Sequence, residues 1–163
     1  MTMSIRLRQG TTGDREQCLA LWVAACAARD GRAVEGVADR ARPKFDECVS
    51  WLIAGDRDRV DGFALSTRLR SGRGADPYDA AVLGLIATEP ERQGRGLGRA
   101  LLRAASRDLA ALGYGRAVLH ARLDNAIAVH LYESEGWVPS GEVYEHPLWR
   151  LPTRAFVRTL RTA

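Results

Sequence analysis

The chain has 163 residues, of which 46% are hydrophobic and 27% charged, an ordinary balance for a folded protein that argues against intrinsic disorder. The net charge of +4 favours nucleic acid only weakly, because lysines and arginines form no block of five or more, and we expect no nucleic-acid partner. No apolar run approaches the ~20 residues of a membrane span, so we expect one cytoplasmic domain over residues 1–163 with no membrane partner.

The N-terminal part carries two helix patterns. Residues 5–10 alternate apolar and polar side chains, which predicts a short strand, and the following "TTGD" is a helix start signal. Apolar residues then recur at helical spacing over residues 14–29, until Gly31 ends the run. A second helix is expected within residues 37–49, where Pro43 would be tolerated only near the first turn.

Two apolar segments follow, and their pattern leaves two structures open. Residues 50–55 and 59–69 flank the polar turn "DRD" and predict a β-hairpin. The alternative is a longer helix, because apolar residues from Phe45 to Ile53 also continue the helical spacing.

Three cysteines, Cys18, Cys26 and Cys48, lie in this half of the chain. They are odd in number and lack C-x-x-C spacing, and two of them fall in the first helical pattern. We therefore expect buried thiols rather than a disulfide or a metal site.

The central part predicts a strand followed by a helix. Residues 70–79 are rich in glycine and charge and are typical of a mobile connection. The continuous apolar run of residues 80–88 indicates a strand buried on both faces. A helix with leucines at i, i+4 intervals then begins near Leu97 and stops at Gly113.

The C-terminal part repeats this order. Residues 116–123 predict a strand, and residues 124–136 predict a helix with Asp124 or Asn125 as its N-cap. Two short strands are expected at the end, in residues 137–141 and 154–160, around an aromatic loop. Together these elements predict an α+β protein with a single mixed, mainly antiparallel sheet of about six to seven strands, flanked by helices.

The stretch "RQGRGLGR", residues 92–99, places three glycines directly before the helix at Leu97. A helix N-terminus offers unpaired backbone N–H groups and a partial positive charge that suit a phosphate, and glycines allow several amides to point inward. Arg92, Arg95 and Arg99 would add charge at the rim. A plain strand-to-helix turn is the alternative, and neither the P-loop nor the dinucleotide fingerprint is matched.

Two spaced motifs lie on either side of this helix. The first is a Q-x-x-G-x-G sequence formed by Gln93, Gly96 and Gly98. The second, N-x-x-A-x-x-x-Y-x-x-x-G-W, is formed by Asn125, Ala128, Tyr132, Gly136 and Trp137. Both motifs resemble those of the GNAT superfamily of acyl-CoA-dependent N-acyltransferases. The resemblance is close over residues 80–138 and elsewhere extends only to the order of elements.

The resemblance implies acetyl-CoA as co-substrate, no metal, and a sheet splayed at the acyl-CoA site. The strand at Ile86, Ala87 and Thr88 would leave backbone groups free to pair with the amides of pantetheine, because an unpaired buried ladder is costly. Asn125 would contact the pantetheine arm, a role compatible with capping its helix, and Trp137 is expected in the core. The diphosphate would be bound by Gln93, Gly94, Arg95, Gly96, Leu97, Gly98 and Arg99.

Tyr132 is the expected proton donor. It follows Asn125 by two helical turns, which places a phenol near the expected position of the CoA sulfur, and the leaving thiolate needs a proton. The family motif supports this role, whereas the spacing alone suits a core aromatic residue equally well.

The general base is His120 in our interpretation. Many superfamily members carry a glutamate on the strand before the glycine turn, where this chain has apolar side chains from Val82 to Ile86. His120 stands where ribosomal-protein N-terminal acetyltransferases resembling this chain carry a catalytic glutamate, and a neutral imidazole suits a base. A structural histidine is the alternative, with solvent, Glu145 or His146 accepting the proton.

These features favour an N-acetyltransferase that acts on a primary amine of a small molecule or peptide by direct attack. The alternative is a catalytically idle acyl-CoA-binding or protein-interaction module. The acceptor is expected to contact about residues 28–48 and 142–153, where the carboxylates Asp30, Glu35 and Glu145 could receive a cationic amine, although a mixed solvated surface is the more common explanation of such side chains. Assembly as a homodimer is compatible with these features.

Overall fold

The computed structural model describes residues 5–56, 58–69, 80–92 and 94–160, so the predicted connection at 70–79 and Gln93 lie outside the described residues. In this part, one sheet has the strand order β1-β2-β3-β4-β5-β7-β6, and only β4 and β5 are parallel neighbours. The strands are β1 (Leu7–Gln9), β2 (Cys48–Ala54), β3 (Gly62–Arg68), β4 (Ala80–Thr88), β5 (Arg116–Arg122), β6 (Val138–Glu145) and β7 (Pro152–Thr159). The predicted α+β class with a mixed, mainly antiparallel sheet is confirmed.

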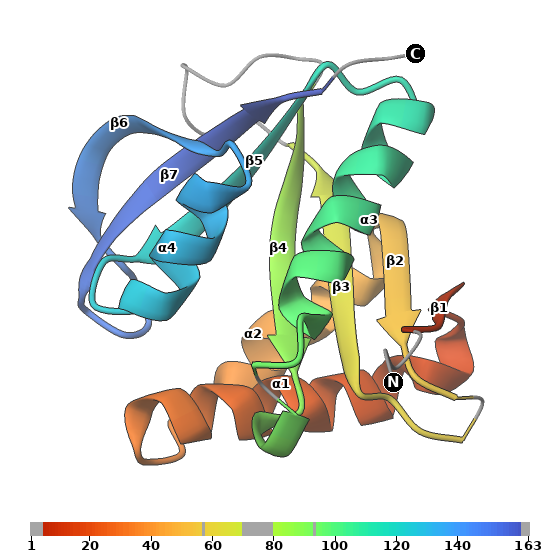
Figure 1. The fold of residues 1–163 in the computed structure, drawn as a ribbon. Helices are drawn as coiled ribbons and strands as arrows, with labels where there is room; N and C mark the ends of the chain where they lie inside the picture. The colour runs from red at the N-terminus through yellow and green to blue at the C-terminus, as the bar shows by residue number, and fades with distance from the viewer. Residues whose placement is uncertain (1–4, 57, 70–79, 93, 161–163) are drawn as a thin grey trace.

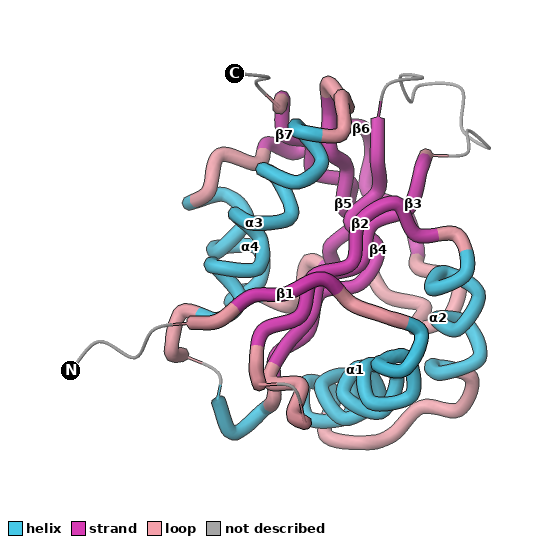
Figure 2. The backbone as a smooth tube through the Cα atoms, turned by 90° about the vertical axis from the view of Figure 1, so that its right-hand side faces the viewer, coloured by secondary structure: helices cyan, strands magenta, loops and turns pink. Residues whose placement is uncertain are grey.

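Helices cover both faces of this sheet (Figures 1 and 2). One face carries α1 (Arg15–Asp30) and α2 (Val37–Asp46), and the other carries α3 (Leu97–Ala111) and α4 (Ala126–Ser134). Short 3₁₀ turns, η1 (Thr12–Asp14) and η2 (Pro90–Arg92), precede α1 and α3. Over the described ranges, every helix is too short or too polar to cross a membrane.

The helix ends follow the sequence signals. Thr11 and Asp14 form a capping box before α1, in which the backbone N–H of Thr11 donates to the Asp14 carboxylate at 2.9 Å. Gly31 ends α1 with a φ of 74°, a conformation that glycine adopts without strain. At α4, the Ala128 N–H donates to the side-chain oxygen of Asn125 at 3.4 Å, so Asn125 is the N-cap.

The predicted hairpin is confirmed, and the longer helix is wrong. α2 ends at Asp46, and β2 pairs antiparallel with β3. Leu52 and Ile53 pack in clusters on opposite faces of the sheet, and this two-sided burial produced the ambiguous apolar run. The expectation for Pro43 is also wrong, because it lies in the second half of α2. Pro43 and Asp39, whose carbonyl it cannot pair with, are both exposed, so water can replace the missing bond.

The predicted aromatic loop is shorter than expected, because β6 includes Tyr144 and Glu145. Gly141 has a φ of 74°, and the pairing register shifts between Ser140 and Tyr144. Beyond this irregularity Tyr144 pairs again with Thr153 of β7, which makes Tyr144 a strand residue with a fixed position.

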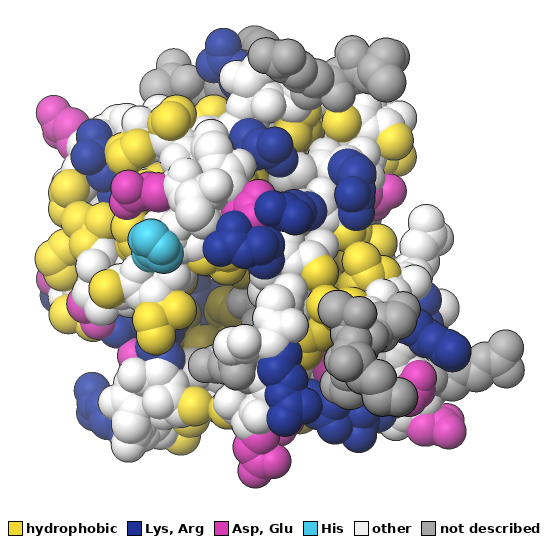
Figure 3. Space-filling model, in the orientation of Figure 1, with side chains coloured by type: hydrophobic (Ala, Val, Ile, Leu, Met, Phe, Trp, Pro, Cys, Tyr) yellow, Lys and Arg dark blue, Asp and Glu magenta, His cyan; other side chains and the backbone are white. Residues whose placement is uncertain are grey.

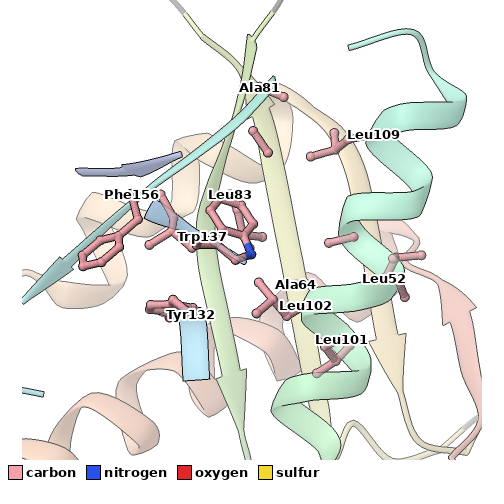
Figure 4. Close-up of a cluster of buried hydrophobic side chains, with 14 of the residues drawn as sticks. Leu52, Ala64, Ala81, Leu83, Leu101, Leu102, Leu109, Tyr132, Trp137 and Phe156 are labelled. Atoms are coloured by element: carbon pink, nitrogen blue, oxygen red, sulfur yellow. The ribbon is translucent and has the colours of Figure 1, made fainter. Parts of the chain in front are cut away.

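Two hydrophobic clusters hold the layers together. In the α3-side cluster, leucines of α3 pack on the sheet beside Tyr132, Trp137 and Phe156, and Trp137 is 2% exposed, as expected of a core residue (Figure 4). In the α1-side cluster, Leu19, Leu21 and Phe45 pack against Ile53, Phe63 and Leu65. Each such side chain contributes about 1.5–3 kcal/mol when fully buried, so the strands between the clusters are held in fixed positions.

A β-bulge at Gly84 interrupts β4. Leu85 pairs with Leu65 of β3 and Leu83 pairs with Ser66, which leaves Gly84 as an extra residue. Leu83 therefore packs in the α3-side cluster and Leu85 in the α1-side cluster, although strand residues two apart normally share a face.

The two central strands separate at the same place. β4 pairs with β5 only from Ala80 to Val82, opposite Arg116 to Val118. Beyond Val82, the edge of β4 that faces β5 has no strand partner within the described ranges, and Figure 1 shows β4 and β5 diverging there. The predicted splay of the sheet is therefore present.

Candidate active site

A cavity of about 1430 Å³ occupies the gap between β4 and β5. Its lining on one face of the sheet comes from the glycine turn, α3 and α4, and Figure 3 shows the hollow on this face. On the other face the lining comes from α1, α2 and residues 146–149. A ligand that entered from the α3 side could therefore meet a second ligand held on the α1 side.

The glycine turn fits a diphosphate. Gly94 and Gly96 have φ values of 84° and 81°, and a Cβ on either residue would meet no atom within 4 Å. Gly96 is the N-cap of α3 and provides no side-chain cap, so the first N–H groups of the helix lack a capping partner. Among the described residues, the turn thus offers open space and backbone N–H groups without a side-chain cap, an arrangement that fits the predicted diphosphate site. Leu97 and Gly98 continue the lining of the cavity.

The arginines of the turn have different surroundings. Arg99 donates to Glu135 and Ser134 of the α4 region, and Arg92 lies 3.4 Å from Asp61. Arg95 is exposed, and none of the described carboxylates forms an ion pair with it. Since two of the three side chains already have partners, we expect the backbone amides of the turn to provide most of the phosphate contacts.

The open edge of β4 fits an extended ligand with amide groups. Ile86, Ala87 and Thr88 all line the cavity, and this edge lies between the glycine turn and the bulge at Gly84. Buried backbone N–H and C=O groups without partners are costly, so a ligand that pairs with them would be stabilised there.

Tyr132 lines the cavity from α4 and belongs to the α3-side cluster, where its ring centroid lies 6.4 Å from that of Phe156. Burial raises the pKa of Tyr132 to about 12, so the phenol keeps its proton at neutral pH. Among the described residues, its hydroxyl has no hydrogen-bond partner and can serve a ligand. Asn125, the N-cap residue of the same helix α4, also lines the cavity.

His120 approaches the gap from the opposite face of β5. Leu119 and Ala121 pack in the α3-side cluster, so the alternation of the strand directs His120 to the α1 side. The Tyr144 hydroxyl lies 2.8 Å from His120 Nδ1, and both residues line the cavity. The predicted acid and the predicted base therefore lie on opposite faces of the gap.

His146 is an unsuitable base. Its Nδ1 accepts hydrogen bonds from the backbone N–H groups of Leu148 and Trp149 at 3.1 and 3.3 Å. Burial first, and then the positive charges around the loop, lower the pKa of His146 to about 4, so the ring is neutral. Because Nδ1 is the acceptor, the hydrogen of the neutral ring is assigned to Nε2, and the ring can only donate there. Glu145 is exposed and lies 3.6 Å from Arg150.

A network that sequence analysis missed fixes the α1-side wall of the cavity. Arg122, whose side chain is 6% exposed, lies 2.9 Å from Asp30 at the end of α1 and 2.6 Å from Asp124. The guanidinium carbons of Arg29 and Arg122 lie 4.6 and 5.4 Å from the ring centroid of Trp149. Arg122 follows His120 by two residues in the same predicted strand, and this spacing, which places both side chains on one face, was the sequence signal that could have identified it.

The carboxylates that could receive a cationic amine do not face this wall. Asp30 is paired with Arg29 and Arg122, and neither Asp30, Glu35 nor Glu145 belongs to the described lining. The cysteines agree with the sequence: Cys18 and Cys26 are buried, Cys48 is half-buried, and all are free thiols. No group of three or more metal-ligating side chains occurs in the described ranges.

A sheet that splays at a bulge beside an uncapped glycine turn defines the class of the acyl-CoA N-acyltransferases. The sequence model of the acetyltransferase (GNAT) family matches residues 16–137. The chain therefore belongs to the GNAT acetyltransferase family, and the predicted family is confirmed.

Individual relatives agree with this assignment. The mycothiol acetyltransferase of Nocardiopsis dassonvillei is 33% identical over 147 residues, which are 82% of this chain and 42% of that protein. The chain spans less than half the length of the curated relatives it matches.

Two solved structures share the fold. The ribosomal-protein-S18-alanine N-acetyltransferase of Escherichia coli superposes with a TM-score of 0.74 at 22% identity, covering 98% of this chain and 96% of its own. An acetyltransferase from Salmonella typhimurium, solved with acetyl-CoA, gives a TM-score of 0.75 at 18% identity and covers 98% and 95% of the two chains.

Proposed function

We propose that the protein transfers the acetyl group of acetyl-CoA to a primary amine by direct attack. The observation that carries this proposal is the unpaired edge of β4, which leads from the uncapped glycine turn to a gap between Tyr132 and His120. Family membership argues against the alternative of an idle acyl-CoA-binding module.

Acetyl-CoA, when bound, supplies a thioester whose C–S bond breaks as the new C–N bond forms. The edge at Ile86, Ala87 and Thr88 would hold the pantetheine amides, and the 94–99 turn would hold the diphosphate. Tyr132 would give its proton to the sulfur, since burial keeps the phenol protonated. His120 would take the proton that the amine nitrogen loses, directly or through one water. The products are an N-acetylated amine and CoA thiol.

The relatives narrow the acceptor only in outline. The names of the curated relatives specify mycothiol, and that of one structural neighbour specifies a ribosomal protein alanine. An amine-bearing small molecule or peptide is the common feature of these acceptors, and we infer the same class here.

The test is release of CoA thiol from acetyl-CoA in the presence of a panel of amines. We expect amine-dependent release with formation of the N-acetyl product, detected by mass spectrometry. The variant Tyr132→Phe serves as the matched negative control. CoA binding without release from any amine would instead support the idle module and overturn the proposed function.

A further inference from the structure

The α1-side wall of the cavity carries unbalanced positive charge. Four cations line it: Arg29, Arg40, Lys44 and Arg122. Asp30 and Asp124 neutralise Arg29 and Arg122. Arg40 and Lys44 have no ion pair with any described residue, and Asp124 is the one acidic residue in the described lining. Within the part of the chain that the structure describes, two positive charges therefore face this side of the cavity without a counter-charge.

Lys44, the only lysine in the sequence, lies against the bulge of β4. A Cβ built on Gly84 would lie 3.5 Å from Lys44 Nζ and 3.6 Å from its Cδ, which is van der Waals distance, so the Lys44 side chain packs directly beside Gly84. Lys44 is half-buried, and Arg40 lies one helical turn before it on the same face of α2. The ammonium group is thus placed at the point where β4 and β5 separate.

The positive charges of this wall also act on His146. After burial, the largest causes of its lowered pKa are Arg40 and Lys44, followed by Arg122 and Arg29. The neutral ring can donate from Nε2, which adds an uncharged donor to the same wall.

This field sets the chemistry of the acceptor. A purely cationic amine would be repelled, whereas a negative group on the same molecule would pair with Arg40 and Lys44 through charge-assisted hydrogen bonds. The same positive charges lower the pKa of a nearby amine and so favour its neutral, nucleophilic form.

We propose that the acceptor is a small amine that also carries a carboxylate, which Lys44 and Arg40 of α2 bind while the amine faces the gap. The proposal rests on the proposed acyl transfer and specifies its substrate class. Lys44 acts here as a specificity-determining residue, and Arg40, which is exposed, supports it from the rim.

The experiment compares matched acceptors and matched variants. Thiol release is measured with the common amino acids and with their carboxamides, which keep the amine and lose the negative charge. We expect kcat/KM to be at least about tenfold higher for the preferred acid than for its amide, as one charge-assisted pair provides. In Lys44→Met this preference should be lost because KM for the acid rises, while KM for acetyl-CoA stays unchanged. Arg42→Gln is the control, because Arg42 lies on α2 but pairs with Glu16 outside the lining.

Two further measurements keep the outcomes distinct. Calorimetric titration of the CoA-bound protein with the same acids and amides reports acceptor binding even if no amine is acetylated. Binding of the acids without acetylation would contradict the proposed acyl transfer but not the proposed acceptor class. Phosphoethanolamine is compared with ethanolamine to separate carboxylate from phosphate recognition. Equal binding of acids and amides, an unchanged preference in Lys44→Met, or a preference for the phosphate alone would overturn the proposal.

Discussion

The Tyr144 hydroxyl lies 2.8 Å from His120 Nδ1, joining β6 to β5 across the intervening strand β7. This contact bears on how His120 can act. His120 accepts a proton at Nε2 only in the tautomer whose Nδ1–H donates to the Tyr144 oxygen. The phenol therefore qualifies as a positioning residue for the proposed base.

The first prediction concerns this pair. His120→Gln should lower kcat/KM by at least about tenfold, a lower bound beneath the usual 10²–10⁴-fold contribution of general-base catalysis, and should remove the acidic limb of the pH profile. Tyr144→Phe should retain an acidic limb at a shifted pH, because the base remains and only its partner is lost. CoA affinity should stay unchanged in both. An unaltered acidic limb in His120→Gln would place the base elsewhere.

The second prediction concerns the glycine turn. Gly96→Glu should abolish CoA binding in calorimetry, because it adds bulk and negative charge where the diphosphate is expected. A non-glycine residue at a φ of 81° also costs about 1–2 kcal/mol of stability. Gly113→Glu controls for this strain, since Gly113 has a φ of 95° with open space around it and lies at the other end of α3. Normal CoA affinity in a folded Gly96→Glu protein would show that the site is misplaced.

The third prediction concerns Tyr132. Tyr132→Phe removes one hydroxyl from the α3-side cluster and should lower kcat by about 10²–10⁴-fold with little change in CoA affinity. Because burial raises the pKa of Tyr132 to about 12, wild-type activity should show no loss from its ionisation up to pH 10. Tyr114→Phe, at the edge of the same cluster but outside the lining, should keep full turnover. A full rate in Tyr132→Phe would make Tyr132 a core residue only.

The fourth prediction concerns the thiols. Burial raises the pKa of Cys18 to about 12 and that of Cys26 to about 11, and it also raises the pKa of Cys48. Since the thiolate is the reactive form, the folded protein should react with Ellman's reagent at pH 8 far more slowly than the denatured chain, which should release three equivalents. Rapid labelling of the folded protein would contradict this burial and would add background to the thiol-release assay.

The sequence was informative where function depends on local pattern. The glycine turn begins α3, and Asn125 and Tyr132 both belong to α4. Each motif therefore depends on the geometry of a single helix, so these residues could be placed before the fold was known. The bulge at Gly84 is different, because it depends on how β4 pairs with β3, and a glycine in an apolar run gives only a weak hint.

The α1-side wall could not be derived from the sequence for the same reason. Lys44 meets Gly84 from a separate helix, and Arg122 meets Asp30 across most of the chain. Such contacts between distant segments depend on the packing of α1 and α2, which cannot be predicted from the periodicity of the sequence. The sequence therefore left the carboxylates of this region as candidates for binding the acceptor, whereas the structure shows that Asp30 is neutralised by arginines.

The last prediction concerns the stability cost of Lys44. Desolvation, followed by repulsion from Arg40, lowers the pKa of Lys44 below its usual value of 10.5, so the folded state binds this proton more weakly than the unfolded state. Unfolding then takes up a proton between the lowered pKa and 10.5, and over that window the folded state gains stability as pH rises. Below the window the charged ammonium destabilises the fold.

Lys44→Met keeps the aliphatic stem against Gly84 and removes the charge, so it should raise the melting temperature at pH 7. The advantage of the variant should shrink as the pH rises towards 10.5, because wild-type Lys44 loses its proton at a lower pH than an unperturbed lysine does. The other titrating groups are common to both proteins. Arg42→Gln, which alters an exposed pair on the same helix, should show no such pH-dependent difference. Thermal unfolding of the three proteins at pH 7 and pH 10 measures this directly. A lower melting temperature for Lys44→Met at pH 7 would mean that Lys44 stabilises the fold, and that its place at the bulge is structural.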